Sequence, residues 1–292
     1  MPRSLANAFD QFVRDIEPTQ NQHREAKRQK KHLRESLDGR LKLERVLIMG
    51  SYARHTAIRP LHDVDIFIVL NEHVHGTLRS QPPSACLNQI LAALQDAYPG
   101  KKVSMRPQRR SVGIDFSQSG IGYDVVPAFE RQPGEYLIPD TDRKSWIKTN
   151  PERHAELCKQ ANQRAGGGLN RLIKAAKHWN GAHGKNLASF HLEVMSYDAF
   201  RSPPESLPEG LATLFGHLTK RIQDGCPDPA GVGPNIDKGL TQEQRTQLAS
   251  QLHNVADKLA RAIDLERQGA DGSVRQAHQI FYKLLGSPYP PP

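Results

Sequence analysis

Cysteines and long apolar runs are scarce in this 292-residue sequence, and no internal repeat is evident. The three cysteines, Cys86, Cys158 and Cys226, are widely spaced and odd in number. This spacing excludes a disulfide framework and a zinc motif, and it predicts a reducing, cytoplasmic location. The sequence contains no apolar stretch long enough to span a bilayer and no hydrophobic signal-peptide segment, so neither feature is expected.

The composition is that of a soluble globular enzyme with a basic surface. Charged residues make up 24% and hydrophobic residues 37% of the chain, which is not the composition of a disordered protein. The formal net charge is +9 and the pI is about 9.5. This charge favours polyanionic ligands such as nucleotides or nucleic acid, although a generic basic surface would give the same balance.

The hydrophobic pattern changes along the chain from helical to mixed and back to helical. Apolar periodicity predicts helices first, at residues 3–16 and 19–37, and apolar runs predict strands at 45–50, 64–70, 111–116 and 122–129, with a helix at 85–98. Helices are expected again at 168–180, 189–200, 207–223, 241–268 and 273–285. We therefore expect an α+β fold with two lobes and a central cleft, divided into residues 1–145 and 146–292.

Two aspartates, Asp63 and Asp65, interrupt the start of the apolar run at 64–70. Side chains alternate along a strand, so the two carboxylates are expected on one face. Carboxylates held side by side repel each other unless a cation lies between them or one is protonated. Short acidic side chains on a rigid strand suit Mg²⁺, which prefers oxygen ligands and completes its shell with water and phosphate. A solvated strand edge is the structural alternative.

A Gly-Ser pair, Gly50-Ser51, follows the preceding predicted strand. It is expected to open a turn into a short helix, with backbone N–H groups and a hydroxyl facing an anion. A phosphate-binding turn close to a metal site is what phosphoryl or nucleotidyl transfer requires.

A two-metal mechanism usually uses a third acid nearby, and two candidates lie on predicted strands. Asp124 sits in "YDVVPAF", where an acid flanked by apolar residues is costly without a cation, and it is the favoured candidate. Asp115, in "GIDF", is the alternative.

Taken together, "GSYARHTAIRP", "HDVDIFIVL" and "YDVVPAF" resemble the bacterial CD-NTases. These are the cyclic GMP–AMP synthase-like nucleotidyltransferases of CBASS anti-phage systems, within the polymerase-β-like superfamily. The Asp motif alone indicates only the superfamily. Later segments carry the narrower resemblance over nearly the whole chain: "SWIKTNPERH", "RLIKAAKHWN", "LASFHLEV", "DPAGVGPNI" and "QAHQIFYKLLGSPYP".

The resemblance implies a polymerase-β-like nucleotidyltransferase core in residues 1–145, a C-terminal helical domain, and a role for each matching residue. Asp63, Asp65 and Asp124 match the acids that bind two Mg²⁺ ions, for which Mn²⁺ can substitute. Nucleotide-binding positions match Gly50, Ser51, Lys177, Ser189 and Phe190. His55 departs from the family pattern, because relatives often carry glycine there.

The implied activity is condensation of NTPs into a cyclic di- or trinucleotide second messenger. A ribose hydroxyl attacks an α-phosphate, pyrophosphate leaves, and a downstream effector responds to the product. Two other interpretations stay open: a nucleotidyltransferase that modifies an RNA, protein or small molecule, and an inactive nucleic-acid-binding sensor module.

The second predicted helix carries bases at spacings of three and four residues. We call the basic face the set of Arg24, Lys27, Arg28, Lys31 and Arg34. This face could bind a regulatory RNA or DNA, but basic runs are also common on solvated helices.

Overall fold

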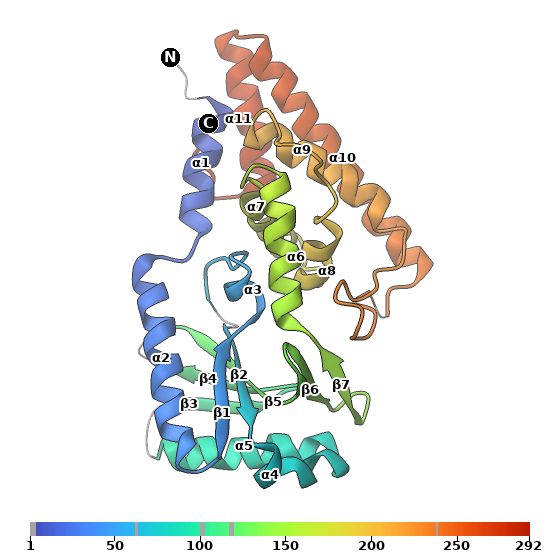
Figure 1. Cartoon of the computed structure of the whole chain (residues 1–292). Helices are drawn as coiled ribbons and strands as arrows, with labels where there is room; N and C mark the ends of the chain where they lie inside the picture. The colour runs from blue at the N-terminus through green and yellow to red at the C-terminus, as the bar shows by residue number, and fades with distance from the viewer. Residues whose placement is uncertain (1–3, 62–63, 100–102, 117–119, 238) are drawn as a thin grey trace. The chain divides into compact units, whose positions relative to one another are not determined.

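The computed structural model describes residues 4–61, 64–99, 103–116, 120–237 and 239–292. The chain forms two compact units (Figure 1). The sheet unit comprises Pro18–Ala155 and Ala230–Pro234, and the helical unit comprises Met1–Glu17, Glu156–Pro229 and Asn235–Pro292. This division differs from a split at residue 145 in three ways. The short segment Ala230–Pro234 groups with the sheet unit. The N-terminal 17 residues group with the helical unit, and the main boundary lies ten residues later.

Among the described residues, a mixed sheet of seven strands forms the centre of the sheet unit. The strands are β1 (Leu43–Ile48), β2 (Val64–Leu70), β3 (Val103–Pro107), β4 (Val112–Phe116), β5 (Gly122–Gln132), β6 (Glu135–Asp140) and β7 (Ser145–Thr149). Their order is β1-β2-β5-β4-β3, with β6 pairing with β5 and β7 with β6. β2 and β5 run parallel, while the other pairs are antiparallel. The sequence predicted β1, β2, β4 and β5 and missed the other three.

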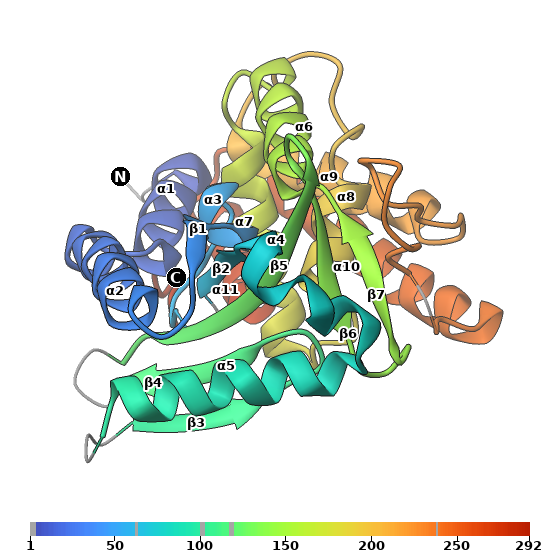
Figure 2. The same ribbon diagram turned by 60° about the horizontal axis from the view of Figure 1, so that its bottom comes forward.

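Two helices, α2 (Gln20–Asp38) and α5 (Pro83–Ala97), share a core with one face of the sheet. Figure 2 shows α5 lying along β3 and β4. Alternate residues of β2, such as Ile66 and Ile68, belong to this core, whereas Phe67 and Val69 belong to a second cluster with β6 and β7. The strand is therefore apolar on both faces beyond its first residues, which explains its continuous hydrophobic run.

Short connections join these elements. They are α3 (Gly50–Ala53), α4 (Glu72–His75) and the 3₁₀ helix η1 (Gly76–Ser80). The short helix predicted after Gly50-Ser51 is therefore confirmed as α3. At the other end of the sheet unit, α6 (Pro151–Arg164) begins directly after β7.

The described part of the helical unit contains most of α6 and six further helices: α1 (Leu5–Ile16), α7 (Leu169–Ala182), α8 (Ser189–Met195), α9 (Leu207–Arg221), α10 (Gln242–Arg267) and α11 (Asp271–Leu285). α1 joins them because its apolar stripe is fully buried there: the Phe9 ring lies 6.4 Å from that of Phe281 on α11, and the Phe12 ring 5.3 Å from that of His178 on α7. Burying a Phe side chain contributes about 1.5–3 kcal/mol. α8 ends at Met195, five residues before the predicted end at Phe200.

None of the helices in the described part of the chain is long and apolar enough to cross a membrane.

Candidate active site

Asp65 and Asp124 lie side by side on the two parallel strands. Asp65 of β2 is the register partner of Asp124 of β5, and neighbouring strands in a sheet are about 4.8 Å apart. The next residue on each strand, Ile66 or Val125, is buried in the core shared with α2 and α5. Both aspartates therefore point to the opposite face, where both are half-buried. Two carboxylates at this spacing favour a cation between them.

Gly50 lies directly against Asp65. Its φ of +66° is in the left-handed region that favours glycine. A Cβ atom at this position would stand 1.7 Å from Asp65 Oδ2, so no other residue fits without displacing the carboxylate. The preceding residue fixes the turn, because Met49 N donates a hydrogen bond to the Asp65 carbonyl at 2.8 Å. The predicted Gly-Ser turn therefore lies against Asp65, one of the predicted metal-binding acids.

The turn closes through Ser51 and His55. Ser51 is half-buried in α3, and its carbonyl accepts a hydrogen bond from Thr56 N at 2.9 Å. His55 is exposed with φ +58°, again in the left-handed region. Glycine adopts this backbone most readily, and histidine is among the few other residues enriched in it, so His55, the departure from the family pattern, can occupy the position.

The two candidates for the third acid have different surroundings. Asp115 of β4 is 43% exposed, and it accepts a hydrogen bond from Arg106 Nη1 at 2.6 Å. Its partner on β5 is Gly122, two residues away from Asp124. Only Asp124 is the register partner of Asp65, so the geometry favours Asp124 over Asp115 as the third acid.

One residue near this site was not expected from the sequence. The side-chain amide of Gln108, in the turn between β3 and β4, donates a hydrogen bond to Asp124 Oδ1 at 2.9 Å. No sequence signal indicated this role, because Gln108 reaches the aspartate only through the pairing of β4 with β5.

The donor set fits a divalent metal as far as it is described. Asp65 and Asp124 supply carboxylate oxygens, the ligands that Mg²⁺ prefers. Within the described residues, no group of three or more His, Cys, Asp or Glu side chains could hold a metal ion. The remaining predicted ligand, Asp63, lies outside the described residues.

Lys177 is buried on α7 in the helical unit. Its side chain is 6% exposed, and its ammonium forms an ion pair at 3.0 Å with Glu193 of α8, whose side chain is fully buried. Two further cations on this helix are in more exposed ion pairs, Arg171 with Asp10 and Lys174 with Glu17. The predicted triphosphate contact of Lys177 would therefore compete with a buried carboxylate.

Ser189 and Phe190 form the first turn of α8. Both residues are half-buried, so neither is simply core. Beside them His191 is 2% exposed, and burial lowers the pKa of its imidazole to about 4. His191 is therefore neutral at physiological pH. The nucleotide contacts implied for Ser189 and Phe190 stay predictions.

A cluster of arginines surrounds Asp140 at the end of β6. The carboxylate is fully buried and accepts hydrogen bonds from Arg109 and Arg110 at 2.8–3.0 Å. Burial alone would raise the pKa of Asp140, but these hydrogen bonds and one from the Arg143 backbone outweigh it and lower the pKa to about 2. The cluster ties the β3–β4 turn, which holds Gln108, to β6.

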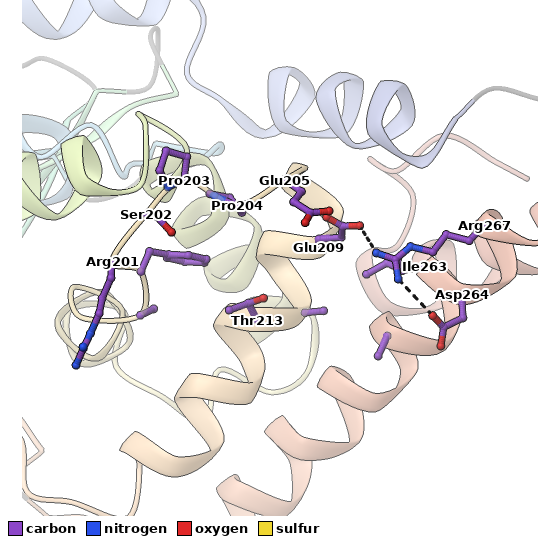
Figure 3. Close-up of a pocket in the computed structure, with 14 residues that line it drawn as sticks. Arg201, Ser202, Pro203, Pro204, Glu205, Glu209, Thr213, Ile263, Asp264 and Arg267 are labelled. Atoms are coloured by element: carbon purple, nitrogen blue, oxygen red, sulfur yellow. Dashed lines mark hydrogen bonds and ion pairs between the residues drawn. The ribbon is translucent and has the colours of Figure 1, made fainter.

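The helical unit also contains an open pocket of about 530 Å³ (Figure 3). Residues of the loop before α9, including Arg201 and Glu205, line one side of it. On another side Arg267 of α10 forms ion pairs with Glu209 and Asp264. None of the described site residues predicted from the sequence lines this pocket.

Comparison with known proteins is consistent with this geometry. The model of the SMODS family, the Second Messenger Oligonucleotide or Dinucleotide Synthetase domain, matches residues 3–162. A cyclic AMP-AMP-AMP synthase from Acinetobacter sp. is 30% identical over 264 residues, covering 81% of this chain and 73% of the relative. A CBASS oligonucleotide cyclase, CdnC of Escherichia coli, is 28% identical over 160 residues, covering 53% of this chain and 51% of the relative.

The fold extends this similarity over the whole chain. The structure of E. coli CdnC in complex with HORMA-deltaN matches with a TM-score of 0.78 at 20% identity, covering 98% of both chains. The predicted α+β nucleotidyltransferase fold is therefore confirmed. Because the family model spans more than half of the sequence, the chain belongs to the SMODS family and is a CD-NTase of the CBASS type.

Proposed function

We propose that this protein condenses NTPs into a cyclic di- or trinucleotide second messenger in anti-phage defence. The observation that carries the proposal is the pairing of Asp65 with Asp124 on adjacent parallel strands, with Gly50 packed against Asp65. This arrangement offers carboxylates for metal binding next to a turn suited to phosphate. The relative named cyclic AMP-AMP-AMP synthase supports ATP as one substrate.

In this proposal Asp65 and Asp124, with Asp63, would hold the divalent metal ions, Mg²⁺ or Mn²⁺. Such ions neutralise charge on the phosphates and lower the pKa of the attacking hydroxyl. The Gly50-Ser51 turn positions the donor triphosphate. A ribose hydroxyl of the acceptor bonds to the donor α-phosphorus, the bond to the β-phosphate oxygen breaks, and pyrophosphate leaves. The linear product repeats the step on its own remaining triphosphate and closes the ring.

The direct test is product formation by the pure protein. It is incubated with all four NTPs and Mg²⁺ or Mn²⁺, the mixture is treated with phosphatase, and the products are identified by mass spectrometry. A cyclic product survives phosphatase because it has no terminal phosphate. NTP consumption only in the presence of an RNA, protein or small-molecule acceptor would instead support the acceptor-modifying alternative.

Substitution of the acids tests the assignment of the site. We expect Asp65→Asn and Asp124→Asn each to lower kcat at least about 100-fold. Even the loss of a residue that only contacts a metal ligand lowers metal affinity or activity about 10–100-fold. Asp115→Asn is the matched control on the neighbouring strand and should retain most of the activity, because Asp115 is paired with Arg106. The opposite ranking would move the third ligand to Asp115.

Other predicted features remain predictions. They are the nucleotide contacts of Lys177, Ser189 and Phe190, the cytoplasmic location, and regulation by RNA or DNA at the basic face. All five residues of the basic face are exposed on α2, and two of them are in ion pairs, Arg28 with Glu25 and Lys31 with Glu35. Ion pairing of this kind is what a solvated helix also shows.

A further inference from the structure

The β3–β4 turn brings a neutral amide to the predicted third metal ligand. Gln108 Nε2 donates to Asp124 Oδ1 at 2.9 Å, and Ser111 Oγ donates to Gln108 Oε1 at 3.1 Å. The backbone of the turn is closed by Gln108 N, which donates to the Ser111 carbonyl at 2.8 Å. The hydroxyl of Ser111 thereby orients the amide so that its N–H faces the carboxylate.

A glycine on β4 makes this contact sterically feasible. Gly113 is the register partner of Asp124, and the Gln108 side chain passes over it. A Cβ atom at Gly113 would stand 2.6 Å from Gln108 Nε2 and 3.5 Å from Asp124 Oδ1. Any larger residue at this position would therefore displace the amide, whereas the aspartate could remain in place.

The turn itself is anchored on its other side. Arg109 and Arg110 donate hydrogen bonds to the buried Asp140 carboxylate, and Thr141 N donates to the Arg109 carbonyl at 3.1 Å. Within this one turn, Arg109 and Arg110 therefore bind β6, and the neighbouring Gln108 binds Asp124. Gln108 is held by this framework and by Ser111.

We propose that Gln108 is a positioning residue for the metal site. Its amide holds Asp124 Oδ1 and would so fix the rotamer in which the Asp124 carboxylate reaches the metal. Partners of this kind orient metal ligands, and their loss typically costs about 10–100-fold in metal affinity or activity. This inference rests on the proposed function, because it assumes that Asp124 binds the metal.

The test measures metal binding separately from turnover. The variants are Gln108→Ala, which removes the amide, and Gly113→Ala, which displaces it. Gln132→Ala is the matched control, since Gln132 Nε2 donates to Glu135 Oε2 at 3.1 Å elsewhere in the sheet unit. Binding of Mn²⁺ alone is followed by electron paramagnetic resonance of the free ion. Turnover with NTPs is followed at increasing Mn²⁺ concentration, and thermal unfolding reports the fold.

We expect Gln108→Ala and Gly113→Ala to weaken Mn²⁺ binding about 10-fold, and we expect high Mn²⁺ to restore much of the lost kcat with little change in KM for NTP. Gln132→Ala should leave Mn²⁺ affinity unchanged. The positioning role is refuted if Gln108→Ala and Gly113→Ala bind Mn²⁺ as tightly as the wild type does. A lower unfolding temperature with unchanged Mn²⁺ affinity would also refute it, and so would a wild type that binds no Mn²⁺.

The two proposals fail in different ways. If the wild type binds Mn²⁺ and Gln108→Ala weakens that binding, the positioning role stands even when the product is not cyclic. If the wild type makes a cyclic product and both variants match it in Mn²⁺ affinity, the proposed function stands and the role of Gln108 does not.

Discussion

Replacing Gly50 with alanine is expected to have two effects on the structure. The first is backbone strain, because an alanine at φ +66° costs about 1 kcal/mol relative to glycine. The second is a shift in the position of Asp65. The added Cβ would lie 1.7 Å from Asp65 Oδ2 and 2.7 Å from its Cγ, while real Cβ contacts essentially never fall below 3.0 Å.

The carboxylate of Asp65 must therefore retreat by about 1.3 Å, the difference between 3.0 and 1.7 Å. Rotation of the carboxylate alone does not relieve the overlap, since its carbon is also too close. A displacement of about 1 Å at a catalytic group can cost about 100-fold in rate. We expect Gly50→Ala to lower kcat by about this factor while unfolding free energy falls by about 1 kcal/mol.

Gly269→Ala is the control for backbone strain. Gly269 follows α10 with φ +73°, and a Cβ atom there would meet nothing within 4 Å. It should lose a similar amount of stability in urea unfolding but keep wild-type turnover in the NTP assay. Wild-type activity in Gly50→Ala would refute the reasoning, and so would an equal loss of activity in both variants.

Two further predictions concern charge. Asp140→Asn should lower the free energy of unfolding by about 2 kcal/mol at pH 7, because the folded pKa of about 2 lies below the ordinary value of 3.8. This stabilisation is complete above about pH 5 and is lost progressively as the pH falls through the folded pKa of about 2. The difference in unfolding free energy between the wild type and Asp140→Asn, measured in urea, should therefore be smaller at pH 3 than at pH 7. An equal difference at both pH values would contradict this prediction. For the basic face, replacing Lys27, Arg28, Lys31 and Arg34 with Glu should remove any stimulation of product formation by RNA or duplex DNA, together with its steep salt dependence. No response to nucleic acid in the wild type would leave the face as a solvated surface.

The central strands could be predicted from the sequence because their apolar residues are buried. β2 and β5 read as strands, and the burial argument at Asp124 identified the acid that the structure pairs with Asp65. β3 was missed because it is a largely exposed edge strand with polar residues at Ser104 and Arg106. An edge strand forms mainly because it pairs with a neighbouring strand, and local periodicity does not reveal that pairing.

Long-range partners were the main information that the sequence did not contain. The apolar stripe of α1 predicted an amphipathic helix, but it could not reveal that Phe9 packs against Phe281 near the other end of the chain. Gln108 is similar, since its contact with Asp124 depends on the register of β4 and on the missing side chain of Gly113. Neither residue type indicates its contact in the sequence, because the contact forms only in the folded chain.

The helix that carries Lys177 was predicted correctly, but the sequence did not reveal the ion-pair partner of this lysine. The spacing places it on α7, but Glu193, its partner, lies on α8 and is fully buried. Removing one member of a buried ion pair costs about 3–5 kcal/mol, because the other charge is left without compensation. A loss of activity in Lys177→Ala would therefore arise from a weakened helical unit as readily as from a lost triphosphate contact. A role in nucleotide binding follows only if KM for NTP rises in a variant whose unfolding free energy is unchanged, which is best sought by replacing Lys177 and Glu193 together.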